Sequence, residues 1–101
     1  MKILAIEHEV PGTAPDQFTP QLKRAEAKRV WELCQADIIR EVYFRADRSE
    51  AVLVLECASV AEAERALATL PMVAANLIAF EVIPLAPYPG LSRLFASTQP
   101  S

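Results

Sequence analysis

Glu81 is the acidic residue whose surroundings best suit proton-transfer chemistry. It lies in the middle of a predicted strand, and Ala79 and Ile83 share its face of that strand. Apolar surroundings disfavour the charged form of a carboxyl group, so its pKa rises toward the range in which a general base works at neutral pH. We therefore predict that Glu81 is a catalytic base. Two other placements stay open, namely an ion pair with Arg40 and a solvated position at the rim of the fold.

Glu7 and His8 are the next candidates, and both lie on a predicted strand at the start of the chain. His8 shares one face of this strand with Leu4 and Ile6, whereas Glu7 points to the other face. Because this strand is predicted to lie beside that of Glu81, Glu7 either approaches Glu81 as a coupled carboxyl pair or sits at an open end of the fold. His8, the only histidine, either assists catalysis or packs in the core. No metal site is expected, because the flanking carboxylates point away from His8 and no second histidine exists.

Four further side chains are predicted to line a binding site. Arg40 suits a bidentate bond to a substrate carboxylate, although an arginine on a strand more often pairs with a glutamate across strands. Tyr43 shares the strand of Arg40 but points to the opposite face unless a bulge shifts the register. Trp31 and Phe18 suit the wall of a pocket as readily as the core.

The elements that position these residues follow a βαβ–βαβ order. Strands are predicted at residues 2–10, 38–45, 50–57 and 77–83, from their apolar residues and their flanking turns. Thr19 before Pro20 predicts the start of a helix to about residue 36, and Ser59 caps a second helix that Pro71 ends. The first helix has an apolar stripe that consists of Leu22, Ala25, Val30, Leu33 and Cys34. We therefore predict an α+β, ferredoxin-like βαββαβ fold: a four-stranded antiparallel sheet with two helices on one face.

The third strand is apolar on both of its faces, with Leu53 and Leu55 on one and Val52 and Val54 on the other. Two helices cover only one face of such a sheet. A second copy of the chain covers the other face by symmetry, so we predict a homodimer or a higher oligomer; a monomer with an apolar exposed sheet is the alternative. We assign residues 1–85 to one domain and residues 86–101, which are rich in proline, to a C-terminal extended arm.

Composition narrows the classes of function. The chain has 101 residues, a net charge of −3 and 52% hydrophobic residues, which argues against a nucleic-acid partner. The apolar run at its start is short and broken by Glu7 and Glu9, so neither a signal peptide nor a membrane anchor is expected. Cys34 and Cys57 are expected to be free thiols in a reducing cytoplasm. With two glycines in the chain, no glycine-rich phosphate loop is present and no cofactor is predicted.

Several segments together carry a family resemblance. They are Arg40 and Tyr43 on the second strand, the Ala46-Asp47 turn, the passage Leu55-Glu56-Cys57-Ala58-Ser59-Val60, the helix end Leu67-Ala68-Thr69-Leu70-Pro71-Met72, and Phe80-Glu81-Val82. In these segments the chain resembles the muconolactone isomerase family of the dimeric α/β-barrel superfamily. The resemblance covers roughly residues 2–91.

The resemblance implies a homodimer whose two sheets form a barrel, with a small-molecule pocket between sheet and helices or inside the barrel. The implied activity is a cofactor-free shift of a double bond in an unsaturated lactone, with Glu81 as base, Glu7 or His8 assisting and Arg40 orienting an anionic group. Two alternatives stay open. One is a non-catalytic ligand-binding or assembly module of the same fold, and the other is a small cofactor-free monooxygenase.

Overall fold

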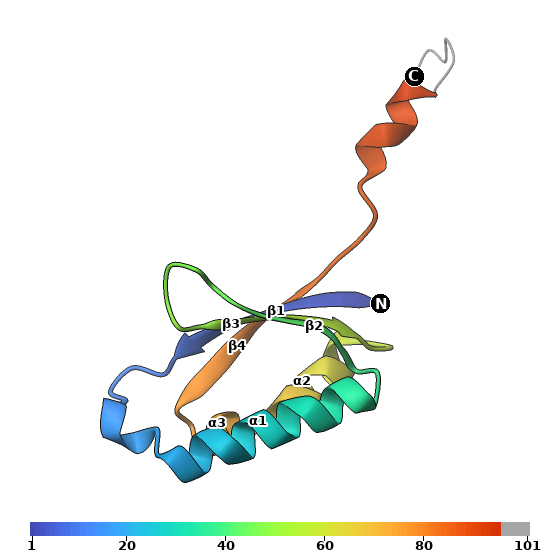
Figure 1. Ribbon diagram of the computed structural model, residues 1–101. Helices are drawn as coiled ribbons and strands as arrows, with labels where there is room; N and C mark the ends of the chain where they lie inside the picture. The colour runs from blue at the N-terminus through green and yellow to red at the C-terminus, as the bar shows by residue number, and fades with distance from the viewer. Residues whose placement is uncertain (96–101) are drawn as a thin grey trace.

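The computed structural model describes residues 1–95 as a four-stranded sheet with helices against one face (Figure 1). The predicted arm, residues 86–101, is described as far as residue 95, and its remainder lies outside the described part. The elements follow in the order β1 (Lys2–Glu9), η1 (Pro15–Gln17), α1 (Pro20–Gln35), β2 (Ile39–Phe44), β3 (Ala51–Glu56), α2 (Val60–Ala68), α3 (Pro71–Ala74), β4 (Ile78–Pro84) and η2 (Pro89–Leu94).

The sheet has the strand order β2-β3-β1-β4, and every neighbouring pair is antiparallel. The predicted α+β, ferredoxin-like fold is therefore confirmed. In Figure 1 the helices lie below the sheet, and no helix covers the upper face. One face of the sheet, the helix face, therefore meets the helices, and the other is the open face. Successive side chains of β1, β3 and β4 point to these two faces in alternation.

The helix starts agree with the sequence signals. The Thr19 hydroxyl accepts a hydrogen bond from the Leu22 N–H, and the Ser59 hydroxyl accepts one from the Glu62 N–H. Each bond satisfies one of the N–H groups that lack a partner in the first turn of a helix. α2 ends at Ala68, before the predicted stop at Pro71, and Pro71 instead opens the short helix α3, where a loop was expected. Proline suits a first helical position because its N–H is not needed there.

Two other segments differ from the predictions. The loop before α1 contains the 3-10 turn η1, and the arm contains the 3-10 helix η2 instead of being extended throughout. The turn from α1 to β2 passes through Asp37 at a φ of 62°. This left-handed conformation is common where a helix ends, and aspartate tolerates it better than most residues other than glycine.

The core lies between the helices and the sheet. Ile3 and Ala5 of β1 pair with Leu55 and Leu53 of β3, and all four are at most 1% exposed. Leu33 of α1 and Leu67 and Leu70 from the α2 region pack on them from below. These contacts fix which face of β1 meets the helices.

The open face of the sheet is apolar as well, which the two-sided pattern of the third strand predicted. Its half-buried aliphatic side chains are Leu4, Ile6, Val52, Val54 and Ile83.

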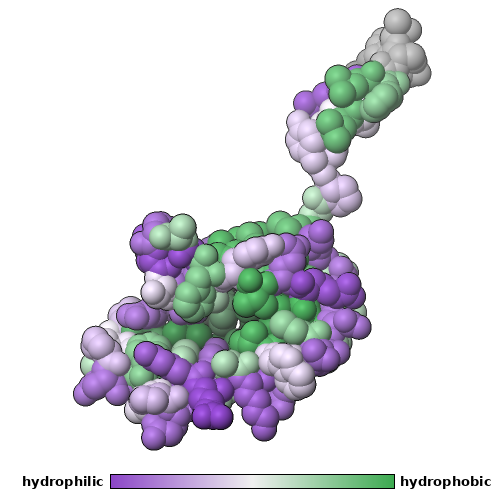
Figure 2. All heavy atoms as spheres, in the orientation of Figure 1, coloured by the Kyte–Doolittle hydropathy of each residue, from purple (hydrophilic) through white to green (hydrophobic). Residues whose placement is uncertain are grey.

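The arm adds a second apolar surface. It leaves the sheet at Leu85, whose N–H donates to the Lys2 carbonyl, and then carries exposed Tyr88, Leu91, Leu94 and Phe95. Figure 2 shows apolar side chains along the arm and between sheet and helices.

Within residues 1–95, no helix has the length and apolar character needed to cross a membrane.

The core contacts predict a large difference between two identical substitutions. Leu55→Ala removes a fully buried side chain, so we expect the free energy of unfolding to fall by about 2–5 kcal/mol. Leu91→Ala, at a position on the arm that is 59% exposed in the single chain, is the matched control and should lower it by a smaller amount. Urea denaturation measures both values. Equal losses in the two variants would contradict the assignment of the core.

Candidate active site

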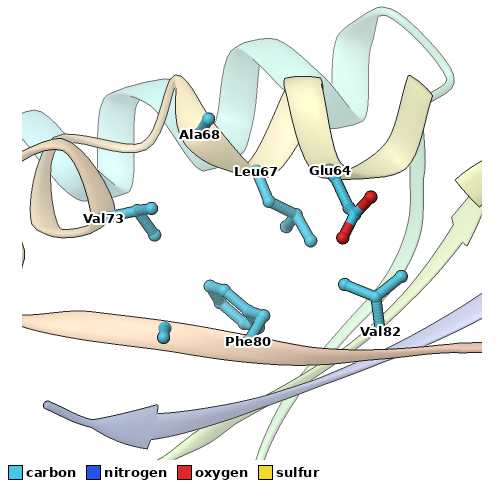
Figure 3. A pocket seen from close by; sticks show the side chains of 7 residues that line it. Glu64, Leu67, Ala68, Val73, Phe80 and Val82 are labelled. Carbon is cyan, nitrogen blue, oxygen red and sulfur yellow. The ribbon is translucent and has the colours of Figure 1, made fainter. Parts of the chain in front are cut away.

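A pocket of about 190 Å³ lies between β4 and the helices α2 and α3. Its lining is Leu67, Ala68, Val73, Ala79, Phe80 and Val82, together with Glu64. In Figure 3, Leu67 and Glu64 reach from α2 toward Phe80 and Val82 on β4, and Val73 closes one side. An apolar lining with few polar groups is typical of a small-molecule site, although this pocket is smaller than most.

Glu7 stands on the helix face of β1, directly opposite Phe80 of β4. The paired residues of β1 and β3 end at Ile6 and Val52. Just beyond this pair, one oxygen of Glu7 accepts a hydrogen bond at 3.1 Å from the N–H of Ala51. The side chain is half-buried. This burial raises the pKa of Glu7 above its usual value, although the bond from Ala51 lowers it.

Glu26 reaches into the same layer from α1. One of its oxygens accepts a hydrogen bond at 2.9 Å from the N–H of Met72 in the first turn of α3. This bond is the side-chain cap that Leu70, at the N-cap position of α3, does not provide. Glu26 is half-buried, and its burial raises the pKa of the carboxyl while the Met72 bond lowers it.

Glu7 and Glu26 are two half-buried carboxyls in the layer between sheet and helices, and neither is among the residues that line the pocket. The charge of Glu26 adds to the rise in the pKa of Glu7, as do smaller contributions from Glu50 and Glu9. Phe80, which faces Glu7, lines the pocket, and so does Val73, which follows the Met72 bound by Glu26. Within residues 1–95, the second oxygen of each carboxyl has no hydrogen-bond or ion-pair partner.

The structure corrects the predicted pairing of Glu7 with Glu81. Glu81 is opposite Ile6 across the β1–β4 ladder, one position away from the Glu7–Phe80 pair. Successive residues of a strand point to opposite faces, so Glu7 meets the helices and Glu81 stands exposed on the open face. The two carboxyls cannot meet across the sheet. Glu26 is the partner of Glu7 instead.

The remaining predicted residues of the strands gather on the open face. Tyr43, Val52, Ile6 and Glu81 form one cross-strand row there, and His8 is opposite Ala79 in the next row. His8 and Glu81 are therefore diagonal neighbours, with Cα atoms roughly 7–8 Å apart. His8 is exposed, so it is not a core residue of the single chain.

A bulge in β2 lies at Arg40. From the sequence, Arg40 and Tyr43 were predicted to point to opposite faces of this strand unless such a bulge shifts the register. The β2–β3 register shifts between Ile39 and Glu41, and Arg40 is the extra residue. The Nε of Arg40 donates to the Asp37 carbonyl at 2.9 Å, and the hydroxyl of Tyr43 donates to Glu41 at 2.7 Å. Glu81 does not take part in an ion pair with Arg40.

Trp31 and Phe18 do not line the pocket. Trp31 is 61% exposed on the outer side of α1, and Phe18 is half-buried in the connection before α1. Their predicted role as pocket walls therefore finds no support within the described single chain.

Glu26 was not among the residues predicted from the sequence, although the sequence holds a signal for it. It stands four residues after Leu22, four before Val30 and seven before Leu33, all members of the apolar stripe of α1. An acidic residue at such a position faces the core, where an ionised carboxylate is costly. Its hydrogen-bond partner could not be predicted from the sequence, because Met72 lies 46 residues away.

Comparison with known proteins assigns the family. The model of a family described as muconolactone delta-isomerase matches residues 3–90. The chain belongs to the muconolactone delta-isomerase family. Among solved structures, a crystal structure of muconolactone isomerase matches with a TM-score of 0.71 and 21% sequence identity, over 100% of this chain and 98% of the other. A comparison with curated proteins finds no match.

These matches bear differently on fold and chemistry. The resemblance seen in the sequence is confirmed by the family match, and the structural neighbour confirms the fold. An isomerase-like or related function agrees with membership of the muconolactone delta-isomerase family. The substrate and the residues that act on it must be argued from the site itself.

The raised pKa of Glu26 predicts how its replacement affects stability. At a pH between the unfolded and folded pKa values, the folded chain holds a proton that the unfolded chain has released, so stability falls as pH rises through this window. Glu26→Gln keeps an acceptor for the Met72 N–H without the charge. We therefore expect this variant to gain stability relative to the wild-type chain as pH is raised from 4 to 8.

The measurement is urea denaturation of both chains across this pH range. Glu41→Gln, at an exposed position of β2, is the control and should show little change with pH relative to the wild type. A relative stability of Glu26→Gln that falls with pH would contradict the assignment of burial as the dominant effect.

Proposed function

We propose that this chain catalyses a cofactor-free shift of a double bond in an unsaturated lactone or a similar carbonyl compound. The observation that carries the proposal is that two half-buried carboxyls, Glu7 and Glu26, have raised pKa values in the layer between sheet and helices, where Phe80, opposite Glu7, lines an apolar pocket. Membership of the muconolactone delta-isomerase family supports the reaction type. Glu64, which also lines the pocket, is exposed and reaches from α2 toward Val82 (Figure 3).

The two carboxyls have different roles in this proposal. Charges of neighbouring carboxylates raise the pKa of Glu7 in addition to its burial, whereas Glu26 shows only the effects of burial and the Met72 bond. Because the charge of Glu26 is one of the causes that raise the pKa of Glu7, we assign Glu26 as the base and Glu7 as the acid. When the surroundings of two titratable groups give them different pKa values, one commonly acts as the acid and the other as the base.

The reaction then proceeds in two proton transfers. Ionised Glu26 removes a proton from a carbon that is acidified by the carbonyl group and its conjugated double bond, and the electron pair spreads toward the carbonyl oxygen. Protonated Glu7 gives its proton to another carbon of the conjugated system, so that the double bond moves. Glu26 is left protonated and Glu7 ionised, and proton exchange with water restores the starting state.

Substitution of the carboxyls by amides tests these assignments. We expect Glu26→Gln to lower kcat by about 10²–10⁴-fold, because general base catalysis is lost while the acceptor for Met72 remains. Glu81→Gln is the matched control and should keep kcat within a few-fold of the wild type. Turnover of muconolactone is followed by ultraviolet absorbance, and circular dichroism verifies the fold of each variant.

The opposite result would assign the role of catalytic base to Glu81, the residue predicted for it from the sequence. A loss of rate in Glu81→Gln, with Glu26→Gln active, would mean that the reaction takes place on the open face, where His8 and Tyr43 accompany Glu81. Binding of lactones without turnover in any form would favour a ligand-binding module. Consumption of oxygen would favour the monooxygenase alternative.

We also propose that the open faces of two chains pack together in a homodimer. Support comes from the half-buried aliphatic side chains of that face and from the arm, whose exposed apolar residues have no partner within residues 1–95. Burial of such a surface is the common reason for sheet-on-sheet assembly. The dimer would enclose Glu81 and His8 between its sheets.

Replacing one aliphatic residue of the open face tests the dimer. We expect Ile83→Lys to shift the mass in solution from at least twice the 11.1 kDa of one chain to the mass of the monomer, because a lysine opposite Leu4 is costly to bury between two sheets. Ala61→Lys, on the exposed side of α2, is the control and should leave the mass unchanged. Light scattering after size exclusion gives both masses. A monomeric wild-type chain would contradict the proposal.

A further inference from the structure

The α2–α3 turn, residues 69–72, is held on one face of α1 by two hydrogen bonds. The Nε of Arg29 donates to the hydroxyl of Thr69 at 2.9 Å, and the carboxyl of Glu26 accepts the Met72 N–H at 2.9 Å. Arg29 follows Glu26 by three residues, so the two side chains are neighbours on α1. Thr69 and Met72 are the two ends of the turn, so α1 holds the turn at both ends.

The bond from Arg29 gives the turn an orientation that its apolar packing alone does not provide. Leu70, inside the turn, is fully buried in the core. Such packing is not directional, whereas hydrogen bonds are. The hydroxyl of Thr69 also donates to the Ala66 carbonyl at 2.6 Å, which links the contact with Arg29 to the last turn of α2. Arg29 therefore fixes the end of α2, and the turn that follows it, relative to α1.

The guanidinium of Arg29 is directed to groups other than Glu26. It forms an ion pair at 3.2 Å with Glu32, which lies one turn further along α1 in the direction away from Glu26. Burial raises the pKa of Glu26, and the Met72 bond lowers it. An arginine bonded directly to a carboxyl favours the charged form and lowers its pKa, which weakens the carboxyl as a base. Arg29 thus holds the turn through Thr69 without an ion pair to the base.

The α2–α3 turn also connects two stretches that line the pocket. Leu67 and Ala68 precede the turn, and Val73 follows Met72 directly. In Figure 3, Leu67 and Val73 both point from the helices toward β4. A displacement of the turn would therefore move the wall of the pocket together with the N–H group that holds Glu26.

We propose that Arg29 is a positioning residue for Glu26. Through Thr69 it holds the α2–α3 turn on α1, and the turn keeps the Met72 N–H in place for the carboxyl. The inference rests on the proposed function for the role of Glu26 as the base, and it adds the residue that keeps this base in position. Arg29 itself takes no part in the proton transfers.

The pH dependence of the Met72 amide proton tests this inference without any substrate. Its NMR chemical shift should follow the ionisation of Glu26, because a hydrogen bond to a carboxylate is shorter and stronger than one to a neutral group. Arg29→Met removes the donor, and Thr69→Val removes the hydroxyl at nearly constant shape. Both should reduce the amplitude of this shift, whereas Thr69→Ser should retain it. Arg24→Met, at an exposed position of α1, is the control and should leave the amplitude unchanged.

The rate of the proposed reaction is the second measurement. We expect Arg29→Met and Thr69→Val to lower kcat by roughly two- to tenfold, the range for one lost hydrogen bond, with little change in KM. In a chain that already carries Glu26→Gln, Arg29→Met should cause no further loss, because both changes act through one carboxyl. A residue that only stabilises the fold would leave kcat of the folded chain unchanged.

The two measurements separate this inference from the proposed reaction. If no lactone is turned over but the amplitude of the Met72 shift falls in Arg29→Met and Thr69→Val, the proposed function fails while the positioning of Glu26 holds. An amplitude in Arg29→Met equal to that of the wild type would overturn the inference. A further loss of rate when Arg29→Met is added to Glu26→Gln would overturn it as well.

Discussion

The register of β1 between its two neighbours is the constraint on which the site depends. Ile3 and Ala5 are buried against Leu55 and Leu53, and this contact turns the odd-numbered residues of the strand toward the helices. Glu7 is the next odd position, so the same packing that forms the core carries a carboxyl into the layer between sheet and helices. A slip of one residue would exchange the two faces and bring His8 there in its place.

The carboxyl pair depends on backbone groups that regular structure leaves without partners. Glu7 accepts the Ala51 N–H just beyond the end of the β1–β3 ladder, and Glu26 accepts the Met72 N–H at the start of α3. These bonds hold both side chains in a half-buried position, where burial raises their pKa values. The same arrangement that secures local structure therefore gives both carboxyls the raised pKa values on which the proposed proton transfer depends. Its expected cost is a stability that declines as they ionise.

The sequence allowed the elements and their order to be predicted, because the signals for them are local. Thr19 with Pro20, Ser59 and Pro71 mark helix ends within a few residues of themselves, and strand alternation is visible within each segment. The pairing of carboxyls could not be predicted in this way. It depends on which residues face each other across β1 and β4 and on contacts such as that of Glu26 with Met72, and these are fixed by packing of the whole chain. The bulge at Arg40 could not be predicted for the same reason, because it arises only where β2 pairs with β3.

The most direct test of this account is a carbon-detected NMR titration of the glutamate side-chain carboxyls. We predict titration midpoints above the ordinary value of 4.5 for both Glu7 and Glu26, and a lower midpoint for Glu7 once Glu26 is replaced by glutamine. Midpoints at or below 4.5 for both residues would contradict the account, because neither carboxyl would then be prepared by burial for the chemistry proposed here.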